Sequence, residues 1–452
     1  MKTLTVLSPT AILGYGFPVD SFQEGLKCNP DVIAVDAGSV DPGPYYLGAG
    51  VSFTDRAAVK RDLTLILTAA RERGIPVFVG SAGGAGAKPH LDWTVEIIEE
   101  IAQEKDLSFK MAVIAADIDK DVLLKRLGST EPLGPLPTLD AERVLASPHI
   151  VAQMGWEPFA RAYREGADVI VAGRAYDPAV FAALAMEKGF DPGPALHMGK
   201  ILECAAIAAD PGSGRDCMVG ILEEQGFRLF PTNPARRCTV RSVAAHSLYE
   251  KSNPWLLPGP GGLLDLRDVV YEQLDERTVR VTGSRHVHGE GEAYRIKLEG
   301  ARPVGYRTLA IAGIRDPLMI KQLNEILEQV KAAAMDNFGT LGGRLNFLAY
   351  GLNGVMGALE PVSQAAHEVG LVIDAVADSQ EAANTLCSFC RSTLLHYGYP
   401  GRVSTAGNLA LPYSPSDIKA GPVFEFSIHH LLTTEPEEFF KPVVYQVGRK
   451  QG

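Results

Sequence analysis

The sequence predicts an α/β protein with a mostly parallel sheet in its N-terminal part, followed by an antiparallel section and a small α+β domain at the C-terminus. Two patterns carry this prediction. Short, apolar, β-branched runs alternate with helical patterns in the first part, as parallel strands with right-handed crossovers do. From about residue 262 polar and apolar residues alternate instead, which is typical of antiparallel strands with one solvated face.

The first part supplies six candidate strands. They are apolar throughout, which favours burial on both faces of a parallel sheet. Apolar residues at helical spacing mark 57–74 and 93–106 as connecting helices. Spacing alone leaves an open doubly wound sheet and a barrel as alternatives, and we favour the open sheet. The expected strands are residues 3–7, 31–36, 76–80, 110–116, 148–153 and 168–173.

The later part of the chain supplies the antiparallel section and the C-terminal domain. A helix over 317–336 separates the two, and a Gly-containing stretch near 337–343 marks the expected boundary. We therefore expect a parallel α/β domain over 1–260, its completion over 261–338 and a small α+β domain over 339–452. The remaining expected strands are 269–283, 293–300, 306–313, 344–351, 370–378 and 423–432, with a helix over 379–398.

Composition excludes several classes of protein. The 452 residues carry a net charge of −11 and lack a Lys/Arg cluster with interleaved aromatics, so no nucleic-acid surface is expected. No apolar run approaches the roughly 20 residues of a membrane helix. Six cysteines in so long a chain do not suggest a disulfide scaffold. We expect a cytoplasmic protein without membrane contact, and a homo-oligomer as is general for metabolic enzymes of this size.

Several predicted strands end in polar, Gly-rich loops, and the carboxyl edge of a parallel sheet is where ligands bind. Asp36 ends the strand 31–36, and Asp41 follows five residues later in a Pro-Gly turn. Carboxylates beside a cleft act as general acid and base or as oxygen ligands for Mg²⁺. The alternative for Asp41 is a simple turn in which its side chain bonds its own backbone.

The loop after the strand 76–80 runs SAGGAGAKPHLD. Successive glycine N–H groups before a helix form an anion cradle, suited to a phosphate or a substrate carboxylate. The loop matches neither a Rossmann fingerprint nor a Walker A motif. Close packing of helix and sheet is the alternative, but His90 and Asp92 directly after the loop favour a functional role. The residues assigned to this substrate site are Ser81, Gly83, Gly84 and Gly86.

A third strand end supplies Arg174, Tyr176 and Asp177. The planar guanidinium of an arginine is the usual partner of a carboxylate or phosphate, so these residues join the candidate substrate site. The alternative is an Arg–Asp pair that braces the loop.

A helical pattern over 197–207 places His197, Lys200, Glu203 and Cys204 on or near one face. Lys200 and Glu203 are candidate catalytic residues. Cys204 would need a lowered pKa to serve as a nucleophile, and a small buried hydrophobe is the preferred interpretation. The CxxC of Cys387 and Cys390 lies inside a helical pattern and favours core packing.

His246 and Glu250 lie four residues apart, a spacing that on a helix can hold a metal or pair a base with a carboxylate. Local hydrogen bonding of His246 is the alternative. No cofactor is identified by a motif. A divalent metal is one option, with ligands drawn from Asp36, His90, Asp92, His246 and Glu250.

The motifs DPGPYYLG, GSAGGAGAKPHL, VAGRAYDPAVFAAL, HMGKILECAAI, SVAAHSLYEKSNP and GPGGLLDL together resemble the acyclic terpene utilisation (AtuA) family of bacteria. The resemblance covers most of 1–330, and the tail over 350–361, 406–418 and 421–430 resembles the C-terminal region of longer members. It implies a role in the breakdown of branched compounds such as citronellol and geraniol, close to acyl-CoA and small carboxylate metabolism. It implies no settled catalytic mechanism.

These observations predict an enzyme acting on a small branched carboxylate or its CoA thioester by lyase, hydratase or isomerase chemistry. Removal of a proton next to a carbonyl needs a base, an anion clamp and a group that stabilises the enolate. Asp36 or His90 would be the base, the 81–86 backbone and Arg174 the clamp, and Lys200 or a metal the stabiliser. A hydrolase of an amide, lactone or thioester that uses a metal or Cys204 is an alternative, as is a non-catalytic subunit that binds acyl-CoA.

Overall fold

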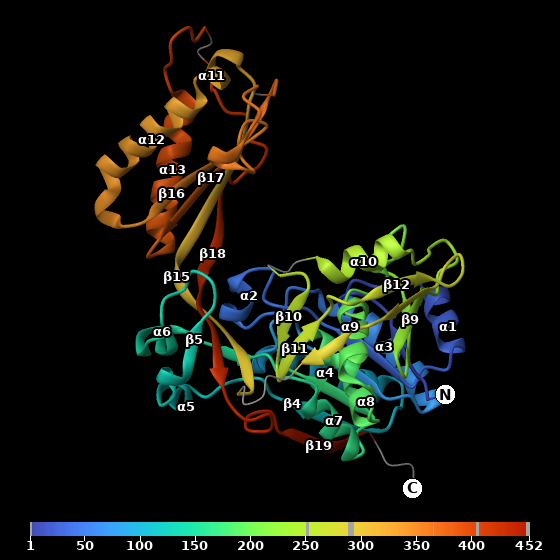
Figure 1. Ribbon diagram of the computed structural model, residues 1–452. Coiled ribbons are helices and arrows are strands. Elements are labelled where there is room, and N and C mark those ends of the chain that lie inside the picture. Colours follow the sequence, from blue (N-terminus) through green and yellow to red (C-terminus); the bar gives the residue numbers. More distant parts are fainter. Residues whose placement is uncertain (1, 250–252, 288–292, 365, 404–405, 449–452) are drawn as a thin grey trace. The chain divides into compact units, whose positions relative to one another are not determined.

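The computed structural model describes residues 2–249, 253–287, 293–364, 366–403 and 406–448. The chain divides into two compact units, one of residues 1–302 and 426–452 and the other of residues 303–425. The chain passes from the first unit to the second within the long strand β15 (Arg295–Ile314) and returns within β18 (Asp417–Thr433), as Figure 1 shows. Among the described residues no helix combines the length and the apolar character needed to cross a membrane.

The first unit is built on a ten-stranded open sheet, so the expected fold class and the preferred open sheet are confirmed. Its centre is parallel, and antiparallel strands extend both edges. Every residue of the second strand in the chain is buried, as expected for a strand covered on both faces. The strand order is β12 (Val270–Gln273), β13 (Val279–Thr282), β9 (Gly226–Pro231), β8 (Met218–Glu223), β1 (Leu4–Ser8), β2 (Val32–Asp36), β3 (Val77–Gly80), β7 (Val169–Ala172), β4 (Phe109–Ile114) and β19 (Pro442–Val447).

Helices connect these strands, and one of them shows how the sequence sets both of its ends. The side chain of Asp55 accepts from the backbone N–H groups of Ala57 and Ala58, which caps the expected helix over 57–74, and Gly74 ends it in the left-handed conformation. The helices of this unit are α1 (Val19–Lys27), α2 (Pro44–Ala49), α3 (Arg56–Arg73), α4 (Lys88–Glu104), α5 (Lys120–Leu124), α6 (Ala141–Ala146), α7 (Glu157–Arg164), α8 (Asp177–Glu187), α9 (Pro192–Leu202) and α10 (Val240–Leu248).

Short strands complete the first unit. The segment 148–153 was expected in the parallel sheet, but its strand β6 (Ile150–Ala152) pairs antiparallel with β15 instead. The N-terminal half of β15 offers it an unpaired edge, and periodicity cannot reveal which partner a three-residue strand takes. The other short strands are β5 (Thr130–Pro132), β10 (Leu256–Gly259), β11 (Gly262–Asp265) and β14 (Arg285–Val287).

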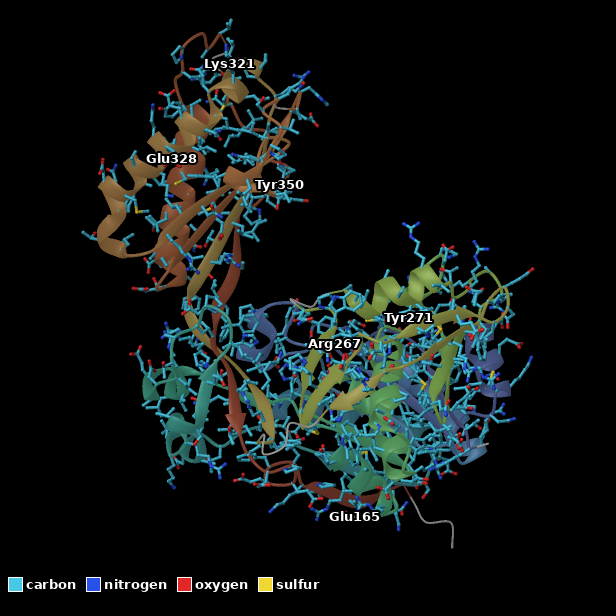
Figure 2. The ribbon with its side chains drawn as sticks, viewed as in Figure 1. Glu165, Arg267, Tyr271, Lys321, Glu328 and Tyr350 are labelled. Atoms are coloured by element: carbon cyan, nitrogen blue, oxygen red, sulfur yellow. The ribbon has the colours of Figure 1, made fainter. Side chains whose placement is uncertain are left out.

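The second unit packs helices against an antiparallel sheet. In α12 the buried residues Leu323, Ile326, Leu327 and Val330 recur at helical spacing, and Glu328 lies exposed between them (Figure 2). Cys387 and Cys390 are buried in the core of this unit, as the packing interpretation expected. Besides the C-terminal half of β15 and the N-terminal half of β18, its elements are β16 (Arg344–Tyr350), β17 (Val369–Ala377), α11 (Pro317–Lys321), α12 (Leu323–Phe338) and α13 (Gln380–His396).

The two units differ from the expected division at 260 and 338. The segments 293–300 and 306–313 were expected as separate strands, whereas they form one strand that pairs with β6 in the first unit and with β17 in the second. Because β15 and β18 each serve both units, the unit boundaries fall inside strands. A search for linker composition cannot find such boundaries.

Candidate functional site

Three neighbouring parallel strands end at one edge of the sheet. Asp36 is the last residue of β2, Ser81 follows β3, and Arg174 follows β7 by two residues. The register aligns Asp36 with Gly80 across the β2–β3 pair, so the loops begin at the same level. The expected convergence of distant segments at the carboxyl edge is therefore what the structure shows for Asp36, Ser81 and Arg174.

Arg174 is buried and connects several segments. Its Nη1 donates to the hydroxyl of Ser81 (3.0 Å) and to Oδ1 of Asp177 (2.9 Å), and its Nε donates to Oε2 of Glu299 (2.8 Å). Burial alone would lower the pKa of Arg174, but the carboxylates of Glu299 and Asp177 more than offset this effect and raise it. The guanidinium therefore organises the strand ends rather than standing ready to clamp a substrate.

Glu299 is the buried counter-ion of this network. It also pairs with Lys297 (2.8 Å), and burial, which raises the pKa of a carboxyl, is outweighed by the two cations, which hold the pKa of Glu299 at about 2. With its amide oxygen turned toward the cations, Gln153 accepts from Arg174 (2.6 Å) and Lys297 (3.2 Å). Arg174 and Lys297 thus share one buried carboxylate and one buried amide.

A second buried ion pair lies where α9 ends. Nζ of Lys200 donates to Oε1 of Glu203 at 2.5 Å and lies 4.8 Å from the ring centre of Tyr249. Burial would lower the pKa of Lys200, but Glu203 raises it, so the amine is charged at neutral pH. The helix expected over 197–207 ends at Leu202, and Ala205 takes a positive φ of 46°. Glu203 directly follows the helix and lies beside Lys200, three residues earlier in its last turn.

Asp36 is a buried carboxyl beside other acids. Burial raises its pKa well above the ordinary value, and the nearby Asp177 and Glu203 raise it further, against the opposing charge of Arg174. Its Oδ1 has no hydrogen-bond partner among the described residues. The raised pKa means that Asp36 keeps its proton to a higher pH than an ordinary aspartate does, which does not favour the role of resting-state base that the sequence suggested.

A cavity of about 750 Å³ opens beside these groups. The loop 258–263, which joins β10 to β11, forms one wall, and Asp41 also lines it. This volume lies within the roughly 300–1,000 Å³ of small-molecule sites. Burial raises the pKa of Tyr176 above its ordinary range, so its hydroxyl stays protonated. Besides Asp41, the described polar side chains that line the cavity are Gln153, Arg174, Tyr176, Asp177, Lys200, Glu203, Arg295 and Lys297.

The glycine loop 81–87 is buried and serves packing rather than the cavity. Gly83, Gly84 and Gly86 all take positive φ, and none of the three lines the cavity. The carbonyl of Gly86 accepts from the N–H of Arg174, and a Cβ at Gly86 would lie 2.1 Å from that nitrogen. The hydroxyl of Ser81 accepts from Arg174, so this loop holds the guanidinium instead of a substrate anion.

His90 and Asp92 also lie away from the cavity lining. Nε2 of His90 lies 3.1 Å from the carbonyl oxygens of both Tyr46 and Val51, so the imidazole ties α4 to the segment that follows β2. Burial lowers the pKa of His90, which keeps the ring neutral. Asp92 forms an exposed pair with Lys88 (2.6 Å). The expected base and metal roles of His90 and Asp92 find no support in this placement.

The predicted metal ligands do not form a cluster in the described part of the chain. Over the described ranges, no group of three or more His, Cys, Asp or Glu side chains is arranged to hold a metal. His246 is buried, its pKa is lowered to about 3 by burial and by Lys200, and its ring stacks 4.6 Å from Tyr249. Glu250, its proposed partner, lies outside the described residues.

His197 and Cys204 are not placed for catalysis. His197 contacts the hydroxyls of Ser284 (2.7 Å) and Ser247 (3.0 Å) in the interior, and burial lowers its pKa to about 3. Burial and Glu203 raise the pKa of Cys204 to about 12, so the thiol is protonated at neutral pH. A nucleophilic thiol needs the opposite shift.

Sequence reasoning missed several residues of the site. Lys297 and Glu299 alternate with Ile296 and Leu298, a pattern typical of a solvated strand face, yet Glu299 is buried. Outside the cavity lining, the sequence also did not single out Glu157: burial raises its pKa to about 7, and Tyr294, which lies against Gly261, donates to it (3.1 Å). A buried arginine needs a carboxylate partner. A search for acidic residues in the predicted strands would therefore have suggested Glu299 as the partner of Arg174.

Glu299→Gln tests the buried network. The lowered pKa means that the contribution of Glu299 to stability is complete above its ordinary pKa of 4.5 and is lost as the pH falls through about 2. We expect the substitution to cost about 3 kcal/mol in the free energy of unfolding near neutral pH, measured by urea denaturation. The free energy of unfolding of the variant should also depend less on pH between about 4.5 and 2 than that of the parent protein. Glu165→Gln, on the exposed pair with Arg161 (Glu165 is labelled in Figure 2), should cost less than about 1 kcal/mol. Equal losses would contradict the assignment.

Gly86→Ala tests the loop packing. The φ of +68° and the 2.1 Å approach to Arg174 predict a loss of about 3 kcal/mol or more in the free energy of unfolding. Gly74→Ala has nearly the same φ, +67°, and nothing within 4 Å, so it should cost only about 1 kcal/mol. Urea denaturation of both variants measures the difference, and a similar loss in the two would show that the close approach is relieved by movement.

A family model described as acyclic terpene utilisation family protein AtuA matches residues 55–219 and 231–414. The match covers most of the chain and includes the loops that carry Arg174, Lys200 and Glu203. Comparisons with curated proteins and with solved structures found no match. The motif resemblance is thereby confirmed, and the chain belongs to the AtuA family, whose description indicates a role in acyclic terpene utilisation.

Proposed function

We propose that this protein is an enzyme that acts on a small branched carboxylate or its CoA thioester by lyase, hydratase or isomerase chemistry. The observation that carries the proposal is a cluster of carboxyls: the buried Asp36, whose pKa burial raises, lies beside Asp177 and Glu203, two carboxylates that line the cavity. A cluster that shares one proton among several carboxyls both accepts and returns a proton, as this chemistry requires. Membership of the AtuA family supports a role in the breakdown of branched compounds, and the choice of reaction rests on the carboxyl cluster.

Glu203 is the proposed base. It lines the cavity, and its partner Lys200 is a buried cation at 2.5 Å. In the proposed step Glu203 removes the proton from the carbon next to the substrate carbonyl, and the electron pair of the broken C–H bond moves to the carbonyl oxygen. The ammonium of Lys200 stabilises the enolate, and its effect is large because little water screens it.

The carboxyl cluster then completes the reaction. Returning the proton to a different carbon gives an isomerase. Delivering a proton to a hydroxyl on the next carbon, which leaves as water, gives a dehydration, and the reverse reaction is a hydration. Asp36 does not line the cavity, so it acts by holding the proton that Asp177 or Glu203 delivers.

Recognition of an anionic substrate is assigned to Lys297 and Arg295. Both line the cavity, whereas the guanidinium of Arg174 already donates to four groups of the protein. An ammonium has three N–H groups, and the described partners of Lys297 are Glu299 and Gln153. The clamp predicted at Arg174 and the 81–86 backbone thus moves to β15. A cytoplasmic location and a homo-oligomer remain parts of this proposal.

Exchange of substrate hydrogens with solvent measures the first step directly. Purified protein is incubated in D₂O with methyl-branched dicarboxylates and branched acyl-CoAs. A substrate should take up deuterium at the carbon next to its carbonyl, and NMR measures the rate of this uptake. Lys200→Met and Glu203→Gln should lower the exchange rate about 100-fold or more. Lys88→Met alters an exposed helical pair at 2.6 Å and should leave the rate unchanged. Absence of exchange with every substrate would count against the proposal, and substrate binding without turnover would favour a non-catalytic subunit.

The pH profile tests the role of Asp36. Because burial raises the pKa of Asp36, the proton stays on the carboxyl well above pH 3.8 and is lost as the pH rises through the raised value. We expect the exchange rate to fall at that point. Asp36→Asn keeps a neutral side chain of similar size, so the protein should remain folded by circular dichroism, with a lower rate and without the alkaline decline. A profile identical to that of the parent protein would remove Asp36 from the mechanism.

A further inference from the structure

A second cleft of about 620 Å³ lies in the first unit and shares no lining residue with the cavity described above. The loop after β1, over residues 9–18, forms one wall, the first turns of α3 a second, and the segment before β8 a third. The N–H of Ala11 and the hydroxyl of Thr10 both donate to the carbonyl of Gly214, which fixes the first wall to the third. The cleft is therefore formed by segments that are bound to one another.

Three arginines line this cleft, and each is held by the protein. Nε of Arg215 donates to the carbonyl of Tyr15 (2.8 Å), and Nη2 of Arg61 donates to the carbonyl of Phe17 (2.7 Å). Arg236 pairs through Nε with the buried Asp216 (2.7 Å). Such contacts lower the entropy that an arginine loses when it binds an anion.

The positive charge of the cleft is only partly balanced. Asp62 pairs with Arg61 (2.6 Å), and it also accepts from the backbone N–H groups of Gly14 and Gly16. Asp216 likewise balances the charge of Arg236 through their ion pair. For Arg215, no described residue accepts from Nη1 or Nη2, so its charge is directed into the cleft without a counter-ion.

Two of these guanidinium groups converge on one point. At Gly16 the position that a Cβ would occupy lies 3.4 Å from Nη1 of Arg61 and 3.8 Å from Nη2 of Arg215. Like charges brought this close repel one another, and an anion between them removes that cost. The absence of a side chain at Gly16 leaves the space open on that side.

The cleft also has an exposed aromatic ring. Tyr15 lines it and is 42% exposed, whereas Phe17 is buried beneath Arg61. A large exposed ring beside clustered arginines suits a ligand that joins a planar group to an anion, because bases stack on aromatic side chains and arginines bind phosphate with two parallel hydrogen bonds.

We propose that this cleft binds the phosphate groups of a nucleotide, between Arg61, Arg215 and Arg236, with the base against Tyr15. The nucleotide portion of a coenzyme A thioester and a free nucleotide both have this chemistry. The proposal does not depend on the reaction assigned to the first cavity, because the residues and the measurement are separate.

Calorimetric titration of the full chain tests the proposal. The probes are pyrophosphate, ADP, adenosine 3′,5′-bisphosphate, coenzyme A and adenosine. We expect the three nucleotide-containing phosphates to bind more tightly than pyrophosphate, adenosine to show no binding, and affinity to fall with added salt. Preference for coenzyme A and the bisphosphate would identify the thioester as the source, and preference for ADP a free nucleotide.

Variants locate the binding. Arg215→Gln should weaken nucleotide binding about tenfold or more. Arg237→Gln removes the same charge from an exposed residue that does not line the cleft, and it should leave binding unchanged. Tyr15→Ala should weaken the binding of nucleotides and leave the binding of pyrophosphate unchanged. Lack of binding by every phosphate probe at millimolar concentration would overturn the proposal, as would equal effects of the Arg215 and Arg237 variants. Pyrophosphate binding as tightly as the nucleotides would overturn the role of Tyr15.

Discussion

Arg174 is buried at the point where β2, β3 and β7 end, and a buried guanidinium is tolerated only when carboxylates and hydrogen-bond acceptors surround it. The chain meets this constraint with Ser81, Asp177 and Glu299, which come from three separate segments. The tight glycine loop 81–87 lets the backbone approach Arg174 closely enough for these bonds. The geometry of the cavity follows, because Asp177 is held by Arg174 itself and Lys297 is held by Glu299, a partner of Arg174.

The same network separates the roles of the acids. Glu299 lies between two cations, and its pKa is held at about 2, whereas Asp36 lies beside two carboxylates and its pKa is raised well above normal. Glu299 is thus an anion at neutral pH that fixes structure, whereas Asp36 keeps its proton to a higher pH than an ordinary aspartate does. Lys200 and Glu203 line the cavity as an ion pair, and Glu203 is one of the acids beside Asp36, which is why we assign the chemistry to them.

The two clefts of the first unit use arginine differently. Arg174 has its donors satisfied by protein groups, so its function is to position other residues. Among the residues that the structure describes, the guanidinium of Arg215 is held through Nε alone, and Arg215 lines the second cleft. Burial accounts for the contrast, since a buried cation must be paired within the protein, whereas one in an open cleft is hydrated or binds an external anion.

The sequence by itself determined the alternation of strands and helices, the parallel character of the first sheet and the location of polar residues at strand ends, because periodicity and glycine placement are local properties. It also predicted Asp36, Arg174, Lys200 and Glu203 as members of one site, and the last three line one cavity in the structure. Only the tertiary structure decided their states and partners. Glu299 lies 125 residues beyond Arg174, and His90 is directed to two backbone carbonyls instead of the cavity. Burial and charge depend on which distant segments pack together, and no local spacing records that.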